Sequence, residues 1–239
     1  MEGKVRTTAV EALRGLNDGA SIAAGGFGVC GVPETLIAAI VQLNARNLTI
    51  VSNNVGLDSG SDIVGVAKLI RNHQVSKLIS SHVSGSEEVI LQLGSGDLHL
   101  ELTPQGTLAE RLRNGGAGII AFYTKTGVGT VVSEGKEIRQ FEGENYVLER
   151  AMRTDWAIVK AWRADREGNL QYRRSAQNFN PVCAMAGRRT IAEVDELVEN
   201  GAIPADQVHT PGIYVHHVVV SKYRKRIEHL TTRPLVCTA

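Results

Sequence analysis

The chain has 239 residues, 43% of them hydrophobic, so it can bury a full apolar core and is not disordered. Its 26 Lys and Arg residues nearly balance 25 Asp and Glu residues, and the net charge of +1 leaves no surplus to attract nucleic acid or an anionic membrane. No apolar run reaches about 18 residues and no signal-peptide pattern is present, so we expect no membrane span and a cytoplasmic protein.

The first predicted elements form a βα unit. Thr8 and Glu11 have the spacing of a capping box, which predicts a first helix. A strand is predicted over Ser21–Ala24, followed by a glycine-rich loop. Pro33 then suits the first turn of a second helix.

Strand and helix patterns continue to alternate through the N-terminal half of the chain. This alternation predicts an α/β fold, with an open, mostly parallel sheet and helices on both faces. Ser61 is predicted to begin one helix, and Thr107 with Glu110 to cap another that ends at Gly115 and Gly116. The further strands of this part are predicted at Leu48–Ser52, Lys77–Ser81, Leu98–Leu102 and Ile119–Tyr123.

The pattern changes between Thr130 and Arg150. Strand-like runs are broken there at 134–136 and 142–145 by residues that suit hairpin turns, which predicts a small antiparallel flap. No linker rich in Pro, Gly or Ser divides the chain, so we predict one domain over residues 1–239. The strands that complete the sheet are predicted at Ala157–Ala161, near Thr190–Val194 and at Tyr214–Val220.

The sharpest local motif is the loop that runs from Gly25 to Pro33. Gly26, Gly28 and Gly31 satisfy the pattern G-x-G-x-x-G between a strand and a helix. This pattern is compatible with an NAD-dependent oxidoreductase. The second strand ends in Ser52-Asn53-Asn54, however, and lacks the acidic residue that such a fold uses for a ribose hydroxyl. We also expect bare backbone amides at the start of the following helix, able to receive an anion or a developing oxyanion.

Other candidate groups are weaker. Cys30 lies in the same loop and could act as a nucleophile, although a small residue packed under a turn is the commoner case. Asn53, Asn54, Gln105 and Gly106 follow predicted strands, at the edge where open α/β sheets bind ligands.

A metal site is not predicted. His216 and His217 are neighbours on a predicted strand, so they should point to opposite faces and not bind one metal together. The three cysteines are widely separated and form no Cys-x-x-Cys pair, which argues against zinc and disulfides.

With these residues in view, the chain resembles the A (alpha) subunits of family I CoA-transferases, most closely those of the succinyl-CoA:3-ketoacid type. The first family signature is matched by Asp18-Gly19, the apolar residues 22–24, Gly25-Gly26-Phe27, Gly31 and Pro33. The similarity spans nearly the whole chain. The other matching runs are Ser52–Asn54, Glu101–Arg111, Ala121–Thr124, Gly127–Thr130, Val159–Trp162, Asn178–Asn180 and Thr210–Tyr214.

The resemblance implies a CoA-transferase/NagB-like fold and a ping-pong transfer of CoA from succinyl-CoA to a 3-oxoacid such as acetoacetate. It places the nucleophilic glutamate on a partner B (beta) subunit, in an A2B2 heterotetramer, and makes coenzyme A a substrate with no further cofactor. Glu199-Asn200-Gly201 resembles part of the glutamate motif, but Leu197-Val198 precedes it, so Glu199 is not expected to be the nucleophile. The residues that would line the thioester and acyl pocket are Gly25, Gly26, Phe27, Gly28, Gly31, Asn53, Asn54, Gln105 and Gly106.

Two departures from the family pattern leave the acyl acceptor open. Ile120 replaces the usual proline, and residues 82–86 differ from the usual stretch, so 3-oxoadipate and acetate are alternatives to acetoacetate. Outside the transferase interpretation, a non-catalytic acyl-CoA-binding module also remains possible.

Overall fold

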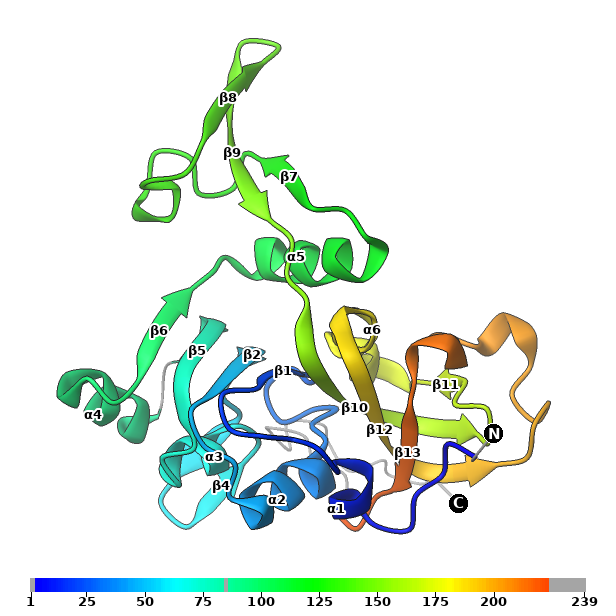
Figure 1. Ribbon diagram of the computed structural model, residues 1–239. Coiled ribbons are helices and arrows are strands. Elements are labelled where there is room, and N and C mark those ends of the chain that lie inside the picture. The colour runs from blue at the N-terminus through cyan, green and yellow to red at the C-terminus, as the bar shows by residue number, and fades with distance from the viewer. Residues whose placement is uncertain (1–2, 84–85, 224–239) are drawn as a thin grey trace, which may run out of the picture.

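A mostly parallel sheet forms the centre of the molecule in the computed structural model, which describes residues 3–83 and 86–223 (Figure 1). Seven strands run parallel in the order β13-β12-β10-β1-β2-β5-β6, and β11 pairs antiparallel with β10. This confirms the predicted sheet. The strands are β1 (Ser21–Ala24), β2 (Leu48–Asn54), β5 (Val75–His82), β6 (His99–Leu102), β10 (Thr154–Asp165), β11 (Leu170–Gln171), β12 (Gly187–Val198) and β13 (His217–Val220).

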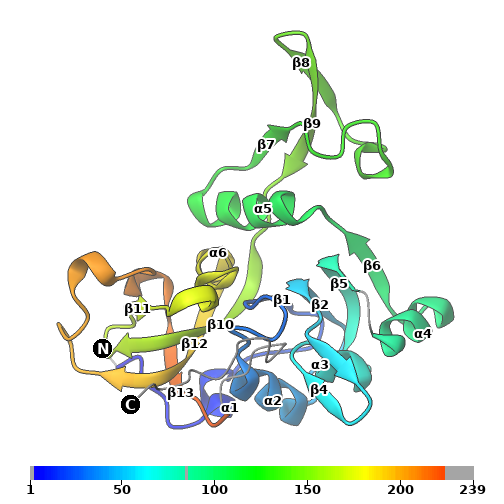
Figure 2. The same ribbon diagram turned by 180° about the vertical axis from the view of Figure 1, so that it is seen from behind.

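Helices cover both faces of this sheet, because alternate strand residues point to opposite sides. Ile22 and Ala24 of β1 belong to the apolar cluster under the first four helices, whereas Ala23 belongs to the cluster under α5 and α6. Figure 2 shows the same two layers from behind. The helices are α1 (Ala9–Ala12), α2 (Glu34–Leu43), α3 (Ala67–Arg71), α4 (Glu87–Ser95), α5 (Gln105–Ala117) and α6 (Asn180–Ala186).

The predicted flap is present as a three-stranded antiparallel sheet in the order β7-β9-β8, which projects beyond α5 (Figure 1). Its hairpin turns at Glu142 and Gly143, both with positive φ. The predicted strand Ile119–Tyr123 belongs to this flap and not to the main sheet. The flap strands are β7 (Ala121–Thr124), β8 (Ile138–Phe141) and β9 (Glu144–Arg150), and a separate hairpin joins β3 (Leu57–Ser59) to β4 (Asp62–Val64).

Two predicted helix starts are wrong. Ser61 lies in the β3–β4 hairpin, because Gly60 adopts positive φ and turns the chain before a helix can form. Thr107 lies inside α5, which begins two residues earlier at Gln105 after Pro104. The other capping prediction is confirmed, since the Thr8 side chain accepts a hydrogen bond from the amide of Glu11.

The glycines at the end of α5 mark close packing, not the predicted helix end. A Cβ on Gly115 would overlap the carbonyl oxygen of Met152, while Gly118 is the residue with left-handed conformation that follows the helix.

The 3-10 turns are Val131–Ser133, Arg174–Gln177, Ala205–Gln207 and Gly212–Tyr214. Among the described residues, no helix combines the length and apolarity needed to span a membrane.

Alanine substitutions at two helical glycines test this packing. Gly115→Ala should lower the free energy of unfolding by about 2 kcal/mol, because the added methyl group displaces the Met152 backbone. Gly94→Ala in α4 is the matched control, since nothing lies within 4 Å of its Cβ position. The control should stabilise the protein by up to about 1 kcal/mol through helix propensity. Urea unfolding measures both, and stabilisation by Gly115→Ala would contradict the packing.

Candidate functional site

The glycine loop between β1 and α2 is the centre of the site. Gly26, Gly28 and Gly31 adopt φ values of 120°, 59° and 70°, which disfavour residues with a side chain. Phe27 and Cys30 exchange two backbone hydrogen bonds of 3.0 Å and close the loop on itself. The glycine spacing therefore builds a tight turn at the carboxyl end of a central strand.

The predicted asparagines and Gln105 meet this loop in one chain of hydrogen bonds. The amide of Gly28 donates to Asn54 Oδ1 at 2.8 Å, and Asn54 Nδ2 donates back to the Gly28 carbonyl at 3.3 Å. Asn53 Nδ2 donates to Asn54 Oδ1 at 3.2 Å, and Gln105 Nε2 donates to Asn53 Oδ1 at 2.9 Å. We call the connected residues Gly28, Asn54, Asn53 and Gln105 the amide wall.

The remaining predicted residues flank this wall. Phe27 is exposed, and Gly106 is exposed on α5 beside Gln105. Ser81, which no local pattern singled out, donates to both oxygens of Asn53 at 2.8 and 2.9 Å and fixes its side chain. Only the adjacency of parallel strands β2 and β5 brings Ser81 to this place.

The amides at the start of α2 are not available to a ligand, so the prediction of bare amides is wrong. The amides of Thr35 and Leu36 donate to Glu193 Oε2 at 2.7 and 3.3 Å. Glu193 has 1% exposure and also pairs with buried Lys160 at 3.2 Å. A carboxylate from β12 therefore occupies the positive end of the helix, where an external anion was expected.

A second buried residue, Asn180 of α6, fixes the glycine loop through side-chain hydrogen bonds. Its Nδ2 donates to the Gly31 and Ala176 carbonyls at 3.0 and 2.9 Å, while its Oδ1 accepts from the Lys160 amide at 2.8 Å. A Cβ on Gly25 would overlap Oδ1, so this position requires glycine. In the sequence, the run Asn178–Asn180 stands out only through its resemblance to the family.

The two alternative chemistries of the loop find no support in this geometry. Cys30 Sγ lies 3.3 Å from Ser175 Oγ, and a hydroxyl is not a base that could activate a thiol. The dinucleotide interpretation needs amides at the helix start for a pyrophosphate, and Glu193 occupies them. Burial raises the pKa of Cys183 to about 12, so that thiol is inert, and Cys237 lies outside the described residues.

Glu199 and the two histidines lie away from this site. Glu199 is exposed directly after β12, and it pairs with Arg166 at 3.0 Å, which lowers its pKa. His216 and His217 were expected on opposite faces, but His216 precedes β13, and both line one surface basin. No cluster of three metal-ligating side chains occurs among the described residues.

Comparison with known proteins gives a consistent result. The family model described as coenzyme A transferase matches residues 6–221. The chain is 55% identical over 217 residues to the A subunit of succinyl-CoA:3-ketoacid coenzyme A transferase from Xanthomonas campestris pv. campestris, covering 90% of this chain and 88% of that protein. It is 52% identical to the probable A subunit of the same enzyme in Bacillus subtilis, covering 97% and 96% of the two chains.

A solved structure shares the fold. An acyl-CoA transferase of E. coli O157:H7, crystallised as a thioester complex with CoA, superposes with a TM-score of 0.80 at 23% identity. The match covers 92% of this chain and 47% of that one, so the chain spans about half of the E. coli protein.

Removing the Asn180 side chain should release the glycine loop. Asn180→Ala leaves two carbonyls and one amide without partners in a buried place, which should lower the free energy of unfolding by about 3 kcal/mol. Gly25→Ala should cost less in the Asn180→Ala background than in the wild type, because the overlap with Oδ1 is gone. Denaturant unfolding of the double-mutant cycle measures this coupling. Strict additivity would contradict the steric contact.

Proposed function

The chain belongs to the coenzyme A transferase family, and from this premise we propose that it is the A subunit of a cytoplasmic succinyl-CoA:3-oxoacid CoA-transferase. It would move CoA from succinyl-CoA to acetoacetate, with CoA as substrate and no further cofactor. A partner B subunit would complete the active site in an A2B2 assembly.

The amide wall is the observation that carries this proposal. Its side chains are uncharged amides that can hold a carbonyl or carboxylate group, and none of them can form an acyl intermediate by attack on a thioester. The buried carboxylate of Glu193 is committed to α2 and Lys160. A covalent transfer therefore needs a nucleophile that this wall does not contain.

In the proposed first half-reaction, a partner carboxylate attacks the carbonyl carbon of succinyl-CoA. The C–S electron pair leaves with CoA as its thiolate, and a mixed anhydride forms. The thiolate then attacks the glutamyl carbonyl, which forms a glutamyl-CoA thioester and releases succinate. The second half-reaction reverses these steps with acetoacetate, so both carbonyl substrates need the same donors.

The glycine loop and the amide wall would supply those donors. The amides of Gly26, Val29 and Gly31 are buried and have no acceptor in the described part of the chain, and the proposal gives them the role of donors to a developing oxyanion. Gln105 is exposed and keeps one amide hydrogen beyond its bond to Asn53, which suits a substrate carboxylate. Because an anhydride hydrolyses readily, a cleft closed by a second chain would also protect it from water.

Two comparisons support a second chain. The curated relatives at 52 and 55% identity are themselves named as A subunits, and the E. coli transferase is about twice as long as the part that this chain matches. The acyl acceptor rests on the relatives' names alone. Ile120 is 86% exposed, and residues 84–85 of the other departing stretch lie outside the described residues.

The role of the wall is tested by Gln105→Ala in a complex coexpressed with the neighbouring B-type reading frame. We expect kcat/KM for CoA exchange between succinyl-CoA and acetoacetate to fall about 10- to 100-fold, since one substrate donor and the support of Asn53 are lost. Gln42→Ala, on the exposed part of α2, is the matched control and should leave the rate unchanged. Equal effects of the two variants would argue against the wall.

The division of labour has its own test. The isolated chain should show no transfer, and Glu199→Ala should leave the rate of the complex within about twofold, because Glu199 is an exposed partner of Arg166. A hydroxylamine-sensitive adduct on the isolated chain would overturn the proposal.

Parallel assays with 3-oxoadipate and acetate identify the acyl acceptor. A complex that binds acyl-CoA but shows no transfer would instead indicate a binding module.

A further inference from the structure

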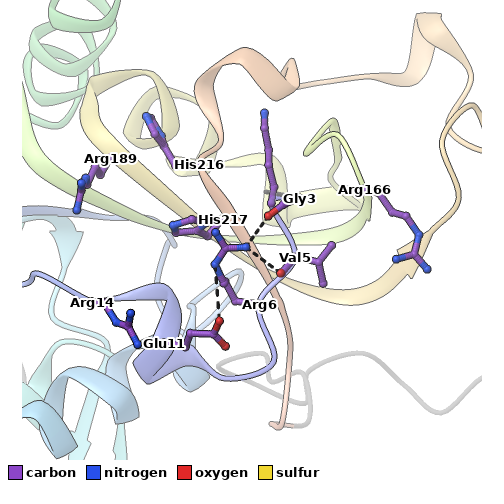
Figure 3. A pocket seen from close by; sticks show the side chains of 10 residues that line it. Gly3, Val5, Arg6, Glu11, Arg14, Arg166, Arg189, His216 and His217 are labelled. Carbon is purple, nitrogen blue, oxygen red and sulfur yellow. Dashed lines mark hydrogen bonds and ion pairs between the residues drawn. The ribbon is translucent and has the colours of Figure 1, made fainter. Parts of the chain in front are cut away.

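A second site candidate lies apart from the glycine loop, in a basin of about 640 Å³ beside β13 (Figure 3). The basin shares no residue with the loop or the amide wall. Five of its ten lining residues are Lys or Arg, two are His and one is acidic, although basic and acidic residues are nearly equal in the whole chain. The lining residues are Gly3, Lys4, Val5, Arg6, Glu11, Arg14, Arg166, Arg189, His216 and His217.

The acidic residue does not neutralise this concentration of positive charge. Glu11 approaches Arg6 at 3.9 Å, at the limit of an ion pair. Arg14 and Arg189 have no carboxylate partner among the residues that the structure describes, and Arg189 lies 5.4 Å from the centre of the Trp156 ring. Two guanidinium groups at the rim of one basin thus lack a counter-ion from the described chain.

The other cations of the basin are already engaged. Arg166 pairs with Glu199 outside it, and Lys4 Nζ donates to the Gly212 carbonyl at 2.6 Å. In Figure 3 the Arg166 side chain points away from the histidines. A ligand of the basin would therefore meet Arg14, Arg189 and the histidine pair.

The pKa values of the two histidines are lowered first by burial and then by the neighbouring cations. Burial, then Lys4 and Arg189, lower the pKa of His216, and burial followed by Arg6 lowers the pKa of His217. His216 Nδ1 accepts from the Thr190 amide at 3.1 Å, so the neutral ring carries its proton on Nε2. His217 Nδ1 is buried and has no hydrogen-bond partner in the described chain.

We propose that this basin binds a small polyanion through its phosphate groups. Guanidinium groups donate paired hydrogen bonds that match a phosphate dianion, and a phosphate would supply the counter-charge that Arg14 and Arg189 lack. The volume lies within the range of small-molecule sites, about 300 to 1,000 Å³. An inorganic polyphosphate and the phosphates of a nucleotide share this chemistry, and the experiment separates them.

The affinity of this site for an anion should also depend on pH. A bound dianion favours protonated histidine and opposes the cations Lys4, Arg6 and Arg189 that disfavour it, so it raises the pKa of His216 and His217. Among the described lining residues, Glu11 is the acidic one, and it acts in the same direction as the anion. Protonation of His216 would also break the bond that its Nδ1 accepts from the Thr190 amide, so proton uptake on binding falls on His217, and affinity should rise as pH falls through the histidine range.

Isothermal titration calorimetry with inorganic pyrophosphate tests the site. We expect saturable binding at low ionic strength, weakened about tenfold by Arg14→Gln and by Arg189→Gln. Arg113→Gln, an exposed residue of α5 paired with Glu110, changes the net charge equally and should leave binding unchanged. Equal loss in all three variants, or no saturation at millimolar pyrophosphate, would overturn the proposal. If Arg189→Gln fails to fold because the contact with the Trp156 ring is lost, the Arg14→Gln variant still tests whether the basin binds pyrophosphate.

Three further ligands define the chemistry. ADP that binds more tightly than pyrophosphate indicates a nucleotide, and the reverse order indicates an inorganic ligand. Citrate that binds as tightly as both would overturn the preference for phosphate. Sulfate, whose charge is constant over the histidine range, should bind about tenfold more tightly near pH 5.5 than near pH 8. An NMR titration in which sulfate leaves both imidazole pKa values unchanged would contradict the site.

Repeating the calorimetry on the complex with the B subunit completes the test. Retained binding supports a ligand site, whereas its loss shows that the basin is a contact between chains and overturns the proposal. Calorimetry needs no turnover, so the result does not depend on the proposed transferase reaction. Conversely, Arg14→Gln should leave the basal transfer rate unchanged, because Arg14 touches neither the loop nor the amide wall.

Discussion

The contact between the buried Asn180 side chain and the glycine loop is the constraint on which the site depends. One amide group satisfies two carbonyls and one backbone amide of three different segments, and Gly25 must lack a side chain to admit it. Leaving these groups unpaired inside the protein would be costly, so the loop has one favoured position. The amide wall is then built onto that position through Gly28 and Asn54.

Two groups of charges stand out in this fold: a buried network of paired side chains, and two arginines that have no carboxylate partner among the described residues. Lys160 is buried between Glu193 and Asp195, at 3.2 and 2.6 Å, and Glu193 in turn neutralises the positive end of α2. This network leaves no anion site at the helix start. The basin beside β13 is the reverse case, since arginines gather there around two histidines of lowered pKa.

The two sites also differ in the kind of partner that their chemistry requires. In the proposed function, the amide wall orients a carbonyl substrate without adding charge and contains no group that attacks it, so a second chain would complete the site. The basin presents the charges of side chains, which match the polyanion proposed for it.

Local sequence signals located the strands of the main sheet and the glycine turn, but not the β3–β4 hairpin or the carboxylate at the start of α2. β1 occupies the predicted residues Ser21–Ala24, and the Thr8 cap and the flap after residue 130 are also confirmed, because alternation, capping and turn residues act over a few positions. The predicted helix start at Ser61 was wrong, because an apolar spacing fits a helix as well as a short hairpin; Gly60 turns the chain into the hairpin, and helix α3 begins only at Ala67.

The sequence by itself thus determined the fold class, the tight glycine turn and the positions of Asn53, Asn54 and Gln105 at strand ends. Only the tertiary structure decided that Glu193 occupies the start of α2, that Asn180 locks the loop, and that both histidines share one basin. Thr35 and Glu193 lie 158 residues apart in the chain. Contacts at that distance arise from the pairing order of parallel strands, which no local pattern encodes.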